Sequence, residues 1–168
     1  TLNSISMLIR MDKKENANKV ISRLGDMLRQ VLLTRDELTV SLEQEFNLTE
    51  KYLSIEAVRF DKMLSYTLKP DEDTLGLQIP DLLLQPIVEN SIKHGMKNLN
   101  RPMHIEISSY MENNQLMIRV KDTGRGFDSS DEGFLKNGIG LKNTIERCEK
   151  MFGKNQISIF SQAGKGTT

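Results

Sequence analysis

The chain has 168 residues, 38% of them hydrophobic and 27% charged, with 23 basic and 23 acidic side chains. That size and composition are typical of one globular domain, or of one compact domain with a helical appendage. The balanced charge gives no sign of the basic surface that binds nucleic acid. The chain has a single cysteine, Cys148, and two histidines, which excludes a disulfide framework and a zinc centre. No window approaches the ~18 apolar residues of a membrane span, so no membrane contact is expected within these residues.

Two apolar stripes at helical spacing occupy the start of the chain, over residues 1–10 and 17–32. The polar stretch Asp12–Asn16 between them is typical of a turn. Together they predict an antiparallel helical hairpin whose apolar seam suits packing against other helices.

A third helix is predicted next, because Ser41–Gln44 fits a capping box and apolar residues recur to Phe60. We expect it to end near Asp61. The chain then changes character, and we divide it into a helical module at 1–60 and an α/β module at 61–168.

The α/β module combines alternating segments, which predict strands, with helical ones. Its predicted strands are Leu64–Lys69, Met103–Tyr110, Leu116–Val120 and Ile157–Ser161, with a turn at Glu112–Asn114. Its predicted helices are Asp81–His94, closed by Gly95, and Gly138–Phe152, ended by Gly153.

Polar side chains share one face of the first of these helices. Asn90, Lys93 and His94 are three or four residues apart, and Glu89 is adjacent. A carboxylate, an amide oxygen and a cation suit a metal-bound phosphate, since Mg²⁺ takes oxygen ligands and shares them with phosphates. Taken alone, the pattern is equally typical of a solvated helix face.

Three glycine-containing motifs follow at intervals. Asp122, Gly124 and Gly126 follow a predicted strand, where the aspartate could accept from an exocyclic amine and the glycines permit a close backbone approach. Gly138 and Gly140, before Leu141, open a helix whose N–H groups could hold phosphate. The stretch Phe127–Asn137 between them could form a lid. The last motif is Gly164–Thr167, and none of the three completes a Walker A or dinucleotide fingerprint.

The ordered set is far more specific than its parts, and it resembles the four boxes of the GHKL ATPase superfamily, which has the Bergerat fold. The stretch Leu82–Gly95 resembles the signature of LytS/YesM-type sensor histidine kinases, as do residues 1–6, Tyr52–Phe60 and Gly138–Arg147. The resemblance covers essentially the whole chain. It implies an α+β fold, a two-layer α/β sandwich preceded by the helical hairpin.

The resemblance also implies a binding site for ATP and Mg²⁺. Asn90 would coordinate Mg²⁺, Glu89 would activate the accepting group, and Lys93 with His94 would contact phosphate. Asp122 would recognise adenine. The remaining expected ATP-binding residues are Gly124, Gly126, Gly138, Gly140, Leu141, Gly166 and Thr167.

In this family the phosphoacceptor histidine lies just upstream of a stretch like Thr1–Ser4, and neither His94 nor His104 fits that role. We therefore expect a fragment that binds ATP without phosphorylating itself. The resemblance implies a cytoplasmic portion of a membrane-anchored bacterial sensor, dimeric through the hairpin, with a response regulator as partner. Two alternatives stay open, which are a gyrase-like ATPase and a non-catalytic nucleotide-sensing module.

Overall fold

The computed structural model describes residues 39–127, 139–154 and 156–168, with scattered positions between 5 and 25. Most of the predicted hairpin and most of the predicted lid therefore lie outside the described residues. The predicted turn at Asp12–Asn16 is too long, because Lys14 and Glu15 are already helical. The chain turns at Asp12, which has φ 55°, and its N–H donates to the Ile9 carbonyl at 3.0 Å.

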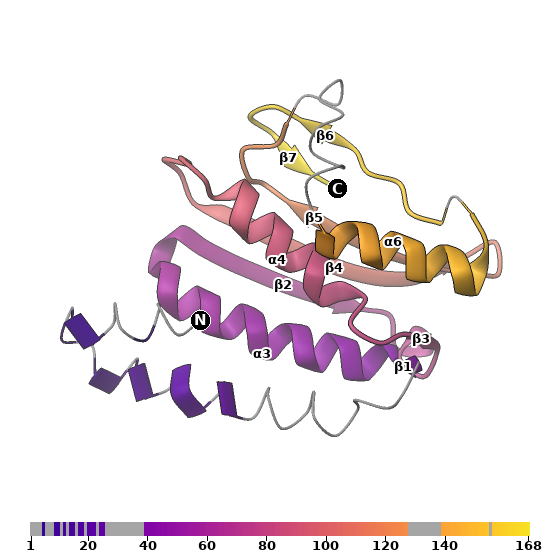
Figure 1. Cartoon of the computed structure of the whole chain (residues 1–168), viewed down its shortest axis with the longest axis horizontal. Coiled ribbons are helices and arrows are strands. Elements are labelled where there is room, and N and C mark those ends of the chain that lie inside the picture. The colour runs from indigo at the N-terminus through magenta and orange to yellow at the C-terminus, as the bar shows by residue number, and fades with distance from the viewer. Residues whose placement is uncertain are drawn as a thin grey trace.

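Three helices cover one face of a five-stranded sheet (Figure 1). The helices are α3 (Leu42–Phe60), α4 (Leu84–Gly95) and α6 (Ile139–Phe152). The sheet has the order β2-β4-β5-β7-β6, formed by β2 (Leu64–Pro70), β4 (Met103–Glu112), β5 (Gln115–Asp122), β7 (Gly166–Thr167) and β6 (Ser161–Gln162). Only the β2–β4 pair is parallel among these strands.

Short elements complete the described fold. A separate two-stranded sheet pairs β1 (Thr39–Ser41) with β3 (Gln78–Pro80). Single turns of 3-10 helix, η1 (Asp61–Met63) and η2 (Glu72–Thr74), flank β2. This two-layer arrangement confirms the predicted α+β sandwich.

The main core lies between the helices and the sheet. Strand β4 alternates buried and half-buried residues, and Met103, Ile105 and Ile107 point toward the helices with no exposed surface. Helix α3 contributes Leu42, Phe46 and Leu53 to this same core, and α4 contributes Leu84, Val88 and Ile92. The division of the chain at residue 60 stays a prediction.

A second, smaller apolar cluster joins the N-terminal region to α3. Ala17 and Val20 are buried against Ile55, with Ile5 and Val58 packed beside them. In Figure 1 the described N-terminal positions accordingly lie along α3, on the side opposite α4. None of the helices that the structure describes is long and apolar enough to cross a membrane.

Several predicted boundaries need correction. Helix α4 begins at Leu84 instead of Asp81, because Leu82 has φ 52° and no helix continues through a left-handed residue. Gly95 is its last helical residue and has no positive φ. The predicted strand Ile157–Ser161 is displaced to β6, although Phe160 exchanges two 2.8 Å backbone hydrogen bonds with Thr168.

The other helices and strands predicted after residue 38 are confirmed within a few residues. The capping box of α3 forms, with Gln44 N–H donating to Ser41 Oγ at 3.2 Å and Ser41 N–H donating to Gln44 Oε1 at 2.8 Å. Strands β4 and β5 are longer than predicted and meet at Asn113 and Asn114. Both asparagines have positive φ, as a tight hairpin turn requires.

Candidate nucleotide-binding site

Asp122 is the last residue of β5 and is only 4% exposed. Its Oδ1 accepts from the Gly124 N–H at 2.8 Å and from the Thr167 N–H at 3.3 Å. The Ser91 hydroxyl of α4 is a further donor to this carboxylate. Burial nevertheless raises the pKa of Asp122 above its ordinary 3.8, against the opposing effect of these hydrogen bonds. The carboxylate thus joins three separate segments of the fold at one buried point.

Two glycines allow α4 to reach this point. A Cβ at Gly124 would lie 2.6 Å from the Gly95 Cα and 2.9 Å from Asp122 Oδ1. A Cβ at Gly95 would lie 2.9 Å from the methyl group of Met103. The end of α4 and the turn after β5 therefore meet backbone to backbone, which only residues without side chains permit.

The last described motif closes the cradle from the other side. Gly166 has φ 106°, and a Cβ there would collide with the Asp122 carbonyl. Gly126 has φ 59° and is equally crowded by the Gln162 carbonyl. Thr167 is held by its Oγ1, which lies 2.9 Å from Ser161 Oγ. Five of the predicted residues, Asp122, Gly124, Gly126, Gly166 and Thr167, therefore lie together.

Backbone hydrogen bonds fix the turn after β5. The Thr123 N–H donates to the His104 carbonyl at 3.0 Å, and Thr123 Oγ1 accepts from the His104 N–H at 2.8 Å. The Arg125 N–H donates to the Gly95 carbonyl at 2.9 Å. Arg101 Nη2 donates to the carbonyls of Gly124 and Gly164, at 3.2 and 2.9 Å. The cradle around Asp122 is therefore tied to its surroundings on several sides.

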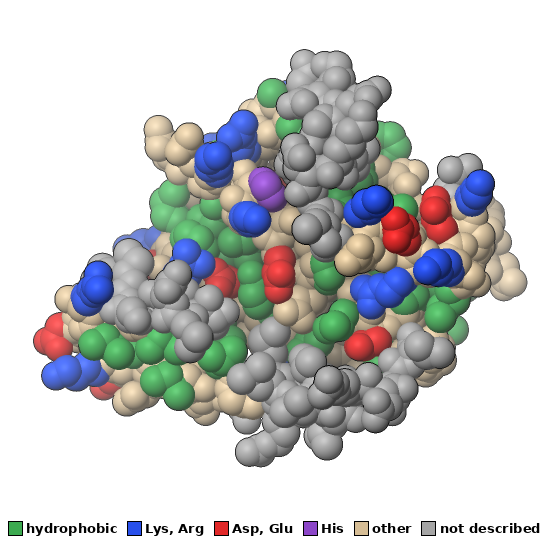
Figure 2. All heavy atoms as spheres, in the orientation of Figure 1, with side chains coloured by type: hydrophobic (Ala, Val, Ile, Leu, Met, Phe, Trp, Pro, Cys, Tyr) green, Lys and Arg blue, Asp and Glu red, His purple; other side chains and the backbone are tan. Residues whose placement is uncertain are grey.

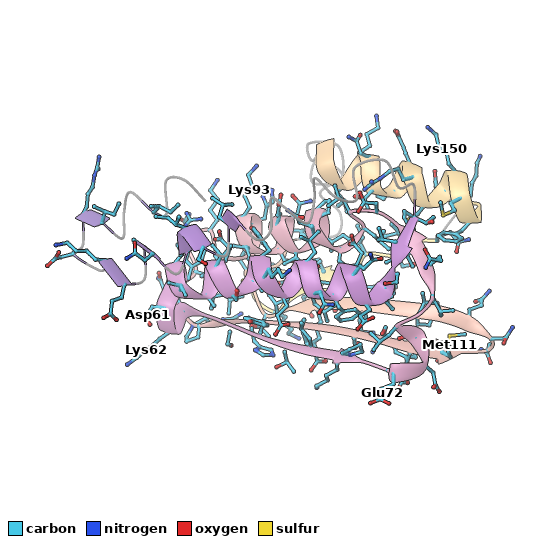
Figure 3. All side chains as sticks on the ribbon, turned by 90° about the horizontal axis from the view of Figure 1, so that it is seen from below. Asp61, Lys62, Glu72, Lys93, Met111 and Lys150 are labelled. Atoms are coloured by element: carbon cyan, nitrogen blue, oxygen red, sulfur yellow. The ribbon has the colours of Figure 1, made fainter. Side chains whose placement is uncertain are left out.

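The polar residues of α4 lie beside this cradle at different depths. Asn90 and His94 are half-buried, whereas Glu89 and Lys93 are exposed. In Figure 3 Lys93 points away from the sheet, from the open side of the helix layer. Glu89 Oε1 accepts from Gln85 Nε2 at 2.9 Å, one turn earlier.

The surroundings of α4 shift the pKa values of Tyr52 and His94. Burial raises the pKa of Tyr52 on α3, and the nearby carboxylates of Glu56 and Glu89 raise it further. Burial lowers the pKa of His94 from its ordinary 6.5. Neighbouring cations lower it further, namely Lys93, Lys97 and Arg125. This end of α4 therefore gathers positive charge, and Figure 2 shows basic side chains gathered on this face over α4.

The predicted phosphate motif before α6 is only partly described. Gly138 and residues 128–137 lie outside the described residues, whereas Phe127 donates its N–H to Ser161 Oγ at 3.0 Å. Gly140 lies in the first turn of α6, which begins at Ile139. Leu141 is buried.

Sequence reasoning missed three residues of this cradle. Ser91 was part of the motif but had no assigned role, although it contacts Asp122. Gly95 was interpreted as a helix terminator, whereas its role is close packing against Gly124. Arg101 gave no signal, because its two acceptors are main-chain carbonyls distant in sequence.

Residues 78–168, more than half of the chain, match the family model of histidine kinase-, DNA gyrase B- and HSP90-like ATPases. The chain belongs to this family. Residues 1–64 match a second model, described as histidine kinase.

Curated relatives agree with this assignment. The chain is 32% identical to the sensor histidine kinase YesM of Bacillus subtilis, over 99% of its own length and 29% of that protein. It is 30% identical to the sensor protein LytS of Staphylococcus epidermidis and to the sensor protein kinase HptS of Staphylococcus aureus, over 99% of its length in each case and 30% and 34% of theirs. The chain therefore spans about a third of these relatives.

Solved structures share the fold at low sequence identity. The histidine kinase domain of a blue-light activated kinase from Erythrobacter litoralis EL346 superposes with a TM-score of 0.62 at 15% identity, covering 96% of this chain and 81% of that one. The histidine kinase AdeS of Acinetobacter baumannii gives a TM-score of 0.58 at 19% identity, with 95% and 81% covered. The predicted histidine kinase fold and family are thus confirmed.

Proposed function

We propose that this chain binds Mg-ATP and forms the catalytic part of a protein-histidine kinase. In the whole protein, the γ-phosphoryl group would pass to a histidine other than His94 and His104, and then to an aspartate of a response regulator. The observation that carries the proposal is the buried Asp122 cradle, next to the cationic end of α4. It supplies an acceptor for an adenine amine and positive charge for phosphates within one site.

Asp122 has an oxygen suited to the adenine. Both backbone donors, Gly124 N–H and Thr167 N–H, reach Oδ1, which leaves Oδ2 with lone pairs for other donors. The buried setting strengthens such a hydrogen bond, because water competes little there. Gly124, Gly126 and Gly166 would form the wall against the base, with Thr167 at its edge.

The residues present also fit Mg²⁺. No three His, Cys, Asp or Glu side chains cluster as metal ligands among the described residues. That suits an ion held mainly by phosphates with one or two protein oxygens, as Mg²⁺ usually is. Asn90 would supply one of those oxygens, and bound Mg²⁺ would neutralise phosphate charge. Lys93 and His94 would bind phosphate oxygens, the start of α6 with Gly138, Gly140 and Leu141 would seat them, and Glu89 would orient or deprotonate the acceptor.

The match of residues 1–64 to the histidine kinase model favours this function over a gyrase-like ATPase. A labelling experiment on the whole protein distinguishes a histidine kinase from an ATPase. ATP labelled at the γ-phosphate should leave acid-labile, base-stable label on a histidine kinase, whereas release of inorganic phosphate without protein label supports the ATPase.

The magnesium role is tested by calorimetry with a non-hydrolysable ATP analogue, with Mg²⁺ and with chelator. Asn90→Ala should weaken Mg²⁺-dependent binding by at least about tenfold and leave Mg²⁺-free binding unchanged. The exposed Asn100→Ala is the matched control and should bind like wild type. Equal loss with and without Mg²⁺ would remove Asn90 from the metal and make it a structural residue.

A further inference from the structure

The junction Asp81–Leu83, between β3 and α4, is held by two charged residues from other helices. The carboxylate of Glu45 on α3 accepts from the Leu82 N–H through Oε1 and from the Leu84 N–H through Oε2, both at 2.8 Å. The guanidinium of Arg147 on α6 donates to the carbonyls of Asp81 and Leu82, at 2.7 and 2.8 Å. Glu45 thus binds backbone N–H groups and Arg147 binds backbone carbonyl groups of the same short segment.

Glu45 is an unusual residue to find at such a position. It is only 1% exposed, and burial raises the pKa of its carboxyl above the ordinary 4.5. A buried carboxylate is retained at a cost unless its hydrogen bonds offset the loss of water. Here both oxygens accept N–H groups at the start of α4, where the helix dipole favours negative charge.

The segment that these residues hold does not adopt its conformation easily. Leu82 has φ 52°, in the left-handed region that residues with a side chain rarely occupy. Ser, Asn and Asp side chains often cap a helix locally, but the residue before α4 is Leu83 and makes no side-chain cap. The start of α4 therefore depends on Glu45 and Arg147 for its backbone partners.

We propose that Glu45 and Arg147 form a clamp of positioning residues that sets the placement of α4 for nucleotide binding. This inference rests on the proposed function, because α4 carries Asn90, Lys93 and His94. Arg147 lies two turns after the start of α6, and Glu45 lies in the first turn of α3. Both helices therefore contact the start of α4 at the same junction. A shift of either outer helix changes the start of α4, and with it the polar face about two turns further on.

The clamp explains an otherwise isolated feature of α6. Among the described side chains of α6, Leu141, Thr144 and Cys148 are buried, and Cys148 belongs to the main core. Its neighbour Arg147 is half-buried, and its Nε is buried without a hydrogen-bond partner within the described residues. The burial of Nε is unfavourable, but the two terminal nitrogens of Arg147 donate to the two carbonyls of the junction. These hydrogen bonds account for an arginine at this position.

Affinity for a Mg²⁺-loaded, non-hydrolysable ATP analogue tests the clamp, measured at a temperature at which thermal scans show every variant folded. Arg147→Met and Glu45→Gln should each weaken binding by roughly three- to thirtyfold, the range of mutations that act on a site through the scaffold. Arg147→Lys should be intermediate, because an ammonium group cannot bridge both carbonyls as the guanidinium does.

Cys148→Ala is the matched control, since it removes a buried side chain next to Arg147 and leaves the hydrogen bonds of Arg147 to the junction in place. It should lower the melting temperature and leave affinity unchanged. If Arg147→Met does not fold, the affinities of the milder variants Arg147→Lys and Glu45→Gln test the clamp. The clamp is refuted when both clamp variants melt earlier yet bind within twofold of wild type. Absence of binding by wild type itself would overturn the proposed function, and the clamp with it.

Discussion

Gly124 shows how a single missing side chain shapes the site. A Cβ at this position would lie 2.6 Å from the Gly95 backbone, which cannot move without shifting α4. Gly124→Ala should therefore destabilise the fold by about 1–3 kcal/mol, the usual cost of overpacking, and weaken analogue binding. Urea denaturation and calorimetry measure the two effects.

Gly76→Ala provides the control for that substitution. No atom lies within 4 Å of a Cβ at Gly76, and its φ is not in the left-handed region. Any general effect of replacing glycine by alanine in the unfolded chain is therefore the same in both variants. Equal stability of the two variants would show that the close contact between α4 and the turn after β5 is not rigid.

His94 makes binding depend on pH in a direction that can be worked out. Its pKa lies below 6.5 in the free protein, because of burial and the cations around it. Bound phosphates would favour the imidazolium and raise that pKa, so the complex binds more protons than the free protein between the two values. Affinity attributable to His94 should then rise as pH falls through this window and be flat at higher pH.

The measurement is calorimetry between pH 5.5 and 8 on wild type and His94→Gln. Titration of the analogue's own phosphates affects both proteins equally and cancels in their difference. His94→Gln should lack the gain at low pH. Parallel profiles for the two proteins would place His94 away from the phosphates.

The residues at the site differ in how far the sequence foretold them. Asp122 and its glycines were predictable because their spacing follows a strand and carries chemical meaning. Ser91 and Gly95 were not, because their roles depend on the residue they meet across the fold, Asp122 and Gly124. The roles predicted for Asp122, the glycines, Asn90 and Lys93 in binding ATP and Mg²⁺ stay predictions.

At the scale of elements, the cap of α3 is a local interaction whose loss should be measurable. Ser41→Ala removes the acceptor for the Gln44 N–H and should cost about 1 kcal/mol in free energy of unfolding. Gln44→Ala removes the reciprocal bond. Because the two bonds form one capping box, the double variant should lose less than the sum of the single ones. Strict additivity would contradict a cooperative cap.

Elements with a clear periodicity were predictable, and short ones were not. Helices α3 and α6 and strands β2, β4 and β5 all carry apolar patterns that span several residues. Strands β1, β3, β6 and β7 have two or three residues each, too few for any period to be recognised. Their pairing is decided by distant partners, as when Thr167 pairs with Asp122.

At the scale of the whole molecule, α3 ties the parts together. One side of α3 packs in the main core, and its Ile55 packs with Ala17 and Val20 in the smaller cluster. Glu45 at its start reaches α4. Helix α3 therefore contacts both the N-terminal region and the start of α4.

The same architecture makes Asp122 a residue that can be changed without unfolding the protein. The raised pKa of Asp122 means that burial disfavours its ionised form, which lowers the free energy of unfolding. This loss of stability is absent below pH 3.8 and complete above the pKa of Asp122 in the folded protein. Asparagine removes that penalty, and its Oδ1 can still accept from Gly124 and Thr167. At pH 7 the Asp122→Asn protein should therefore be at least as stable as wild type.

The ATP site is tested by calorimetric titration of wild type and Asp122→Asn with a Mg²⁺-loaded, non-hydrolysable ATP analogue. Wild type should bind, and Asp122→Asn, folded and no less stable, should lose at least about tenfold in affinity, because an amide N–H₂ would face the adenine amine. Equal binding by the two proteins, or no binding by folded wild type, would contradict the assignment of this cradle as the ATP site.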